Sequence, residues 1–128
     1  SMYHIELAEV YLINENSDRC YYHYEKAYEI DSDTTEIILD FAHAKFELGD
    51  IDEALDLLIK HLENHDEDHR MYHRIASYSF NLGHSEKGYN FLHAALKMNP
   101  KEYILLFEFA PFTENLENVS NIIDLYSK

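Results

Sequence analysis

The sequence has few of the residues that interrupt helices, with only three glycines and two prolines in 128 residues. Because glycine and proline end helices and shape tight turns, their scarcity favours long helical segments over a loop-rich or β-rich fold. There is no tryptophan and only one cysteine, Cys20. A single cysteine cannot form an intrachain disulfide, so we expect a reducing compartment, the cytoplasm. No apolar run reaches the roughly 18 residues of a membrane-spanning helix.

Positive charge is also scarce, because 10 basic residues face 25 acidic ones and the formal net charge is −15. Such a chain repels phosphate groups, so we expect neither nucleic acid nor an anionic membrane surface as a partner. The composition, 46% hydrophobic and 27% charged, is typical of a globular protein rather than a disordered one. We therefore expect one domain over residues 1–128.

Two of the glycines lie in related segments, FELGDIDEALDLL and FNLGHSEKGYNFL, whose glycines Gly49 and Gly83 are 34 residues apart (83 − 49). The same offset relates further small residues and further large apolar residues. The small sets are Ala8, Ala42, Ala76, Ala110; Cys20, Ala54, Gly88; and Ala27, Ala95. The large sets include Leu7, Phe41, Ile75, Phe109 and Leu12, Phe46, Phe80. This recurrence predicts structural repeats of 34 residues.

Apolar residues recur at spacings of three and four within each unit, which predicts two amphipathic helices per repeat. We expect helices near 2–14, 17–30, 34–48, 51–63, 67–82, 85–98, 101–109 and 115–126. Gly49 and Gly83 are expected to end helices in the left-handed conformation. Asn99-Pro100 is expected to start the helix at 101. Asp50 with Glu53, and Asp33 with Glu36, have the spacing of capping boxes.

These motifs resemble the tetratricopeptide repeat family. A small residue is followed by glycine seven residues later and a second small residue five after that, as in Ala42, Gly49, Ala54 and in Ala76, Gly83, Gly88. The first unit departs from the pattern, with Glu15 in place of the glycine. The resemblance implies an all-α, right-handed α-solenoid of antiparallel helix pairs with about three and a half to four repeats. Their expected bounds are 1–34, 35–68 and 69–102, with a degenerate capping repeat at 103–128, where Pro111 shortens the first helix.

The resemblance also implies a function, since the first helix of each pair lines a peptide-binding groove in that family. Carried over by position, the predicted groove residues are Ile5, Glu9, Leu12, Leu39, His43, Phe46, Glu47, His73, Ser77, Phe80, Asn81, Ile104 and Phe107. Aromatic and aliphatic anchors beside carboxylates favour a basic or amphipathic protein or peptide. The alternative for Phe46 and Phe80 is that they belong to the core between helices.

The expected first helix carries apolar residues on nearly all sides, including Ile5, Leu7, Val10, Leu12 and Ile13. A helix of this kind needs neighbours on two sides. We therefore expect the chain to be the C-terminal part of a longer array and to self-associate through this helix. The alternative is a natural N-terminus at this point that dimerises.

A histidine stands at every fourth position of HLENHDEDHRMYH, namely His61, His65, His69 and His73. This spacing suggests a second hypothesis, a metal-binding or metal-responsive protein. The repeat register argues against it, because it places the run across two helices and their connection. The register also aligns His61 with Ala27 and Ala95, so we expect an oversized polar residue that finds a hydrogen bond. Cys20 is expected to be a small buried residue, and we expect no catalytic residues, no cofactor and no enzyme activity.

Overall fold

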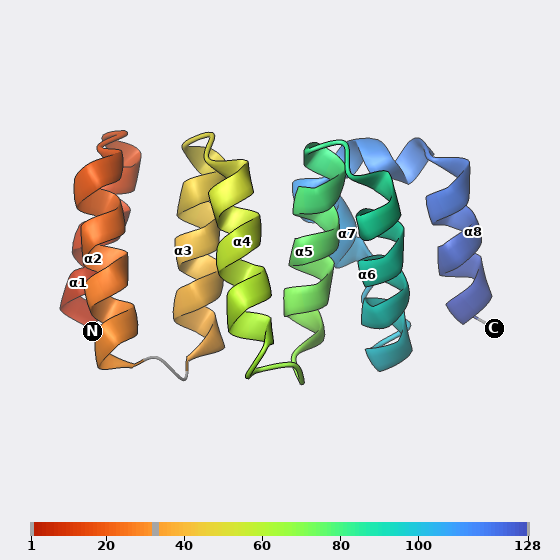
Figure 1. The fold of residues 1–128 in the computed structure, drawn as a ribbon. Coiled ribbons are helices and arrows are strands. Elements are labelled where there is room, and N and C mark those ends of the chain that lie inside the picture. Colours follow the sequence, from red (N-terminus) through yellow and green to blue (C-terminus); the bar gives the residue numbers. More distant parts are fainter. Residues whose placement is uncertain (1, 32–33, 128) are drawn as a thin grey trace. The chain divides into compact units, whose positions relative to one another are not determined.

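The structure is a computed structural model that describes residues 2–31 and 34–127, and these residues form helices and no strands (Figure 1). The α-helices are α1 (Met2–Ile13), α2 (Ser17–Ile30), α3 (Thr35–Glu47), α4 (Ile51–Leu62), α5 (His69–Asn81), α6 (Ser85–Met98), α7 (Ile104–Phe109) and α8 (Glu117–Tyr126). A 3₁₀ helix, η1 (Pro111–Asn115), joins α7 to α8. The all-α fold predicted from the sequence is confirmed, while the right-handed sense of the array remains a prediction.

The chain forms two compact units, one ending at His61 and the other beginning at Leu62. The first unit contains the pairs α1–α2 and α3–α4, and the second contains α5–α6 followed by α7, η1 and α8. A single domain over 1–128 and the four repeat bounds remain predictions.

Small residues allow close helix packing in the first unit. Ala8 and Cys20 are fully buried in one apolar cluster with Tyr24 and Phe41. The rings of Tyr24 and Phe41 stack with centroids 5.4 Å apart, which adds an aromatic contact between α2 and α3. The repeat register therefore identified these core positions correctly.

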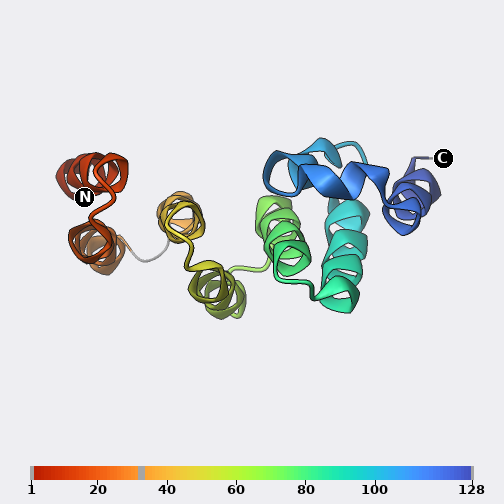
Figure 2. The ribbon, with the colours of Figure 1, turned by 90° about the horizontal axis from the view of Figure 1, so that it is seen from above.

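In the core of the second unit, Phe80 packs with Leu92, Leu96 and Leu106. Gly88 allows this packing, because a Cβ atom at that position would lie 2.7 Å from the Phe80 ring. Figure 2 shows α7 and η1 along one side of the α5–α6 pair. Asn81 fixes α7 there, since its side-chain amide donates to the carbonyl oxygen of Phe109 at 2.8 Å.

The turns within the first three helix pairs share one backbone conformation. Gly49 and Gly83 have φ of +90° and +78°, so the prediction that they end helices in the left-handed region is confirmed. Glu15, the residue at the same register position in the first pair, has φ of +57°. A glutamate there adopts a conformation that favours glycine, and it does so at an energetic cost.

Two helices begin two or three residues later than expected. The helix expected from residue 101 begins at Ile104, because Asn99 Oδ1 accepts a hydrogen bond from the Lys101 amide at 3.3 Å and forms a turn. The helix expected from 67 begins at His69, where Asp68 caps it by accepting from the Arg70 amide. Pro111 ends α7 and starts η1, so the shortened helix is confirmed.

The two residues of the predicted Asp50–Glu53 capping box bond to side chains of other helices. Asp50 Oδ2 accepts the Tyr21 hydroxyl at 2.6 Å and Glu53 Oε1 accepts Lys45 Nζ at 2.9 Å, so both carboxylates of that box bond to other helices. The predicted box of Asp33 with Glu36 involves a residue outside the described part of the chain.

Candidate partner-binding surfaces

The first unit exposes most of its predicted groove residues. On α1, Ile5 and Leu12 are half-buried and Glu9 is exposed; on α3, His43 and Phe46 are half-buried. Leu39 is the exception, because its side chain is buried. This unit therefore offers an apolar surface beside acidic residues, which is the chemistry expected of a site for a basic or amphipathic segment.

His43 and Glu47 lie together at one edge of this surface. His43 Nε2 lies 3.8 Å from Glu47 Oε1, one helical turn further along α3. Both side chains are partly exposed, so the pair is worth little to stability. It leaves a carboxylate at the surface beside Phe46.

The second unit exposes fewer of the predicted residues. His73, Ser77 and Phe80 are buried, and Ser77 Oγ donates to the carbonyl oxygen of Arg74. Asn81 is occupied by its hydrogen bonds to Ser77 and Phe109. The accessible remainder is Ile104, which is 64% exposed, and the half-buried Phe107. Phe80 thus lies in the core, in agreement with the alternative considered for it above.

Lys45 is a residue whose importance the sequence analysis missed. Its side chain is buried, with 8% of its surface exposed. The ammonium group bonds to Glu53 and lies 4.1 Å from the ring centroid of Tyr21 and 5.0 Å from that of Phe41. These contacts offset the cost of removing the charge from water. The spacing of eight between Lys45 and Glu53, across a turn, was the only signal for this pair.

His61 confirms the expectation of an oversized polar residue that finds hydrogen bonds. It is buried, and its Nδ1 and Nε2 atoms lie 3.2 Å from Tyr28 Oη and 3.3 Å from Thr35 Oγ1. The ring therefore joins α4 to α2 and to the start of α3. An imidazole bound on both nitrogens in this way is a structural group in this conformation.

The other histidines of the run do not assemble a metal site. His65 lies between α4 and α5, so the run is divided between elements as the register predicted. Across residues 2–31 and 34–127, no group of three or more His, Cys, Asp or Glu side chains is arranged to share a metal ion. The metal-binding hypothesis has no support in this geometry.

His69 and His73 nevertheless form an unusual pair on α5. Their ring centroids are 5.8 Å apart, and neither ring nitrogen of the buried His73 has a hydrogen-bond partner within the described chain. Burial, and then the nearby His69, lower the pKa of His73 from 6.5 to about 4. His73 is consequently uncharged at neutral pH.

Cys20 has the properties of a core residue. It is fully buried, and burial raises the pKa of its thiol from 9.0 to about 11. A thiol of this kind is not the deprotonated group that nucleophilic chemistry requires. The expectation that Cys20 is a small buried residue is confirmed. No helix of the described chain combines the length and the apolar character needed to cross a bilayer.

The helix pairs, their 34-residue register and their glycine-ended turns define a helical-repeat protein of the kind that presents surfaces to other proteins. Two family models, both described as Tetratricopeptide repeat, match the chain at residues 11–77 and 69–102. The chain belongs to the tetratricopeptide repeat family, whose repeats are generally protein-interaction modules. A search of the curated proteins gave no match.

Proposed function

We propose that this protein is a non-catalytic scaffold that binds a basic or amphipathic segment of another protein through the first helices of its pairs. The observation that carries the proposal is the partly accessible surface of α1 and α3, which includes the half-buried Leu12 and Phe46 and the exposed Glu9 and Glu47. The net charge of −15 favours a ligand of the opposite sign. In the second unit, Ile104 and Phe107 on α7 offer an accessible apolar surface of their own. A cytoplasmic location fits the single free cysteine.

Selection from a random peptide library tests this proposal. We expect enriched peptides to carry Lys or Arg next to an aromatic or aliphatic residue. By calorimetry, their affinity falls when Phe46→Ala removes the anchor, and falls further when Glu9→Lys and Glu47→Lys reverse the charge. Each exposed charge contributes roughly two- to fivefold.

The matched control reverses two acids elsewhere, Glu117→Lys and Asp124→Lys on α8, whose side chains are also exposed. Peptides that bind the control and the Glu9/Glu47 variant with equal affinity would contradict the assignment to α1 and α3. Enrichment of acidic peptides would contradict the proposed ligand class.

We further propose that α1 mediates self-association, because its apolar residues face solvent on several sides. Met2, Tyr3, Val10 and Ile13 are all exposed, Ile13 by 81%. We expect sedimentation equilibrium to show oligomers that Val10→Glu with Ile13→Glu converts to monomers. A strictly monomeric unmodified chain at high concentration would count against this proposal.

A further inference from the structure

A recess of about 350 Å³ lies within the first unit, on a face that the predicted groove does not use. Its lining residues come from α2, α3 and α4: Glu25, Tyr28, Phe41, Lys45, Glu53, Asp56, Leu57 and Lys60. Successive helical residues turn by about 100°, so Phe41 and Lys45 point to the side of α3 opposite His43 and Glu47. We call this site the α2–α4 recess.

The base of the α2–α4 recess is aromatic and carries no unpaired charge. Phe41 is buried there, and its ring also stacks on Tyr24. The charge of Lys45 is neutralised by Glu53 at 2.9 Å and lies against the rings of Tyr21 and Phe41. Because Lys45 is already paired and Phe41 is covered by Tyr24 and Lys45, the half-buried Tyr28 and Leu57 present the apolar surface to anything that enters.

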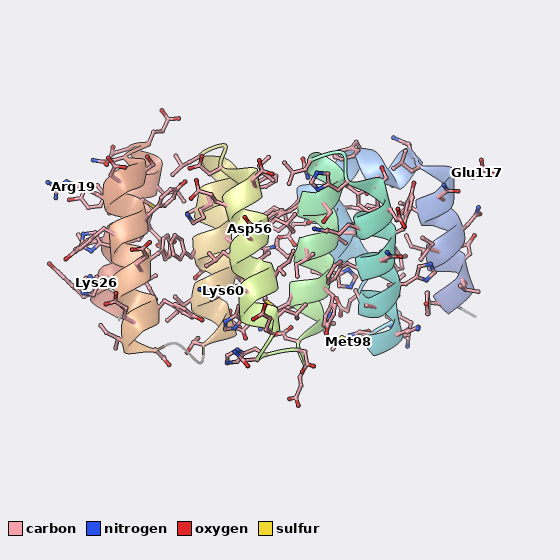
Figure 3. All side chains as sticks on the ribbon, viewed as in Figure 1. Arg19, Lys26, Asp56, Lys60, Met98 and Glu117 are labelled. Atoms are coloured by element: carbon pink, nitrogen blue, oxygen red, sulfur yellow. The ribbon has the colours of Figure 1, made fainter. Side chains whose placement is uncertain are left out.

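The rim of the recess carries carboxylates on two helices. Glu25 on α2 and Asp56 on α4 are exposed, and neither has an ion-pair or hydrogen-bond partner within residues 2–31 and 34–127. Lys60 is one turn beyond Asp56 on α4, as Figure 3 shows. The Tyr28 hydroxyl is bonded to His61, so Tyr28 offers its ring to the recess.

We propose that the α2–α4 recess binds an arginine side chain of a partner protein. The alkyl stem lies over Tyr28 and Leu57, and the guanidinium group reaches between the carboxylates of Glu25 and Asp56. Arginine fits better than lysine, because a planar, weakly hydrated guanidinium stacks on rings and bonds a carboxylate with two parallel N–H groups. This inference rests on the proposed scaffold function and adds a second binding face to it.

The probe is acetyl-arginine-amide, titrated into the full chain and followed by ¹⁵N–¹H NMR. We expect a dissociation constant on the order of millimolar and shifts centred on the amides of Glu25, Asp56 and Leu57. Glu25→Gln with Asp56→Asn weakens binding about three- to tenfold. Lys60→Gln, which removes the one unpaired positive charge at the rim, strengthens it about twofold. The control, Glu117→Gln with Asp124→Asn, removes the same charge from α8 and leaves the affinity unchanged.

Two further probes separate charge from shape. Acetyl-citrulline-amide has nearly the same form without the charge, and acetyl-lysine-amide has the charge without the planar fork. Equal binding of either probe would overturn the assignment to arginine. The site would be overturned if the α8 control weakened arginine binding as much as the Glu25/Asp56 variant, or if the Glu25/Asp56 variant did not weaken it. Chemical-shift changes confined to α1 and the opposite side of α3 would also overturn it. Because Glu9 and Glu47 are unchanged in every variant, failure here does not test the groove, and failure of the peptide selection does not test the recess.

Discussion

The second and third repeats bury different polar side chains in the same register. The second repeat buries Lys45 and His61, where the third has Ser79 and Ala95. The third buries His73 where the second has Leu39. Lys45 and His61 have partners supplied by neighbouring helices, whereas the ring nitrogens of His73 have none in the described chain. Buried polar groups are thus accommodated in this repeat either by pairing with a neighbouring side chain or by remaining uncharged.

The largest expected effect concerns His73 and pH. Because its pKa in the folded protein is about 4, below the ordinary 6.5, the neutral ring favours folding. This contribution is complete above about pH 6.5 and is lost as the pH falls towards 4, by about 2 kcal/mol between pH 7 and pH 5. Denaturant unfolding at both pH values measures it. His73→Leu introduces the residue that the second repeat has at this position, Leu39. We expect this variant to lose the part of the pH dependence of stability that comes from His73.

The exposed His84 supplies the control for that comparison. His84→Gln should retain the full loss of stability between pH 7 and pH 5. If His73→Leu and the unmodified protein lose the same free energy of unfolding, His73 is not the group responsible.

The next effect tests the packing at Gly88, where the second repeat has Ala54. Gly88→Ala places a methyl group 2.7 Å from Phe80, so we expect a loss of about 1–2 kcal/mol from overpacking. Phe80→Leu in the same chain should recover part of that loss in thermal unfolding. Helix propensity alone predicts the reverse, a gain of about 1 kcal/mol, and a more stable single variant would contradict the steric account.

Substitutions at His61 and Ala95, which share one register position, test whether hydrogen-bond partners determine which side chain is tolerated there. His61→Ala removes the hydrogen bonds to Tyr28 and Thr35 and should cost about 1–2 kcal/mol. Ala95→His places an imidazole in the third repeat, where Leu62 occupies the register position of Tyr28 and His69 that of Thr35. We expect this variant to lose at least as much free energy of unfolding. Urea denaturation measures both variants, and a stabilising Ala95→His would show that the partners do not matter.

The smallest expected effect lies in the first turn. Glu15→Gly relieves the cost of a positive φ and should raise the free energy of unfolding by about 0.5–1 kcal/mol. Gly49→Ala is the matched change in the opposite direction and should lower it by a similar amount. A destabilised Glu15→Gly variant would mean that the glutamate makes a compensating contact.

The 34-residue register predicted the helix pairs, the left-handed glycines and the burial of Cys20 and His61, because it reports which side chains meet between helices. It did not predict that Glu15 would keep the glycine conformation, since that depends on the backbone path between two packed helices. The start of α7 was wrong because an asparagine side chain bonds equally well in a turn. The candidate groove residues came from the family resemblance, which did not predict the burial of Leu39, His73, Ser77 and Phe80, because burial depends on the packing of neighbouring side chains. The recess was missed because it depends on Lys45 being buried rather than exposed.

The chemical labelling of the enclosed Lys45 ammonium can be used to follow the opening of the first unit. Amine-reactive reagents modify a lysine at a rate set by how often its nitrogen reaches solvent. Lys45 is enclosed by Glu53, Tyr21 and Phe41 and is only 8% exposed, so we expect its labelling to be slow until these contacts loosen, whereas the exposed Lys97 is labelled in the closed state. Mass spectrometry of the ratio of the two products over time therefore measures the opening equilibrium of the first unit under native conditions. A ligand in the α2–α4 recess will slow the modification of Lys45 and of Lys60 at its rim, and it will leave that of Lys97 unchanged.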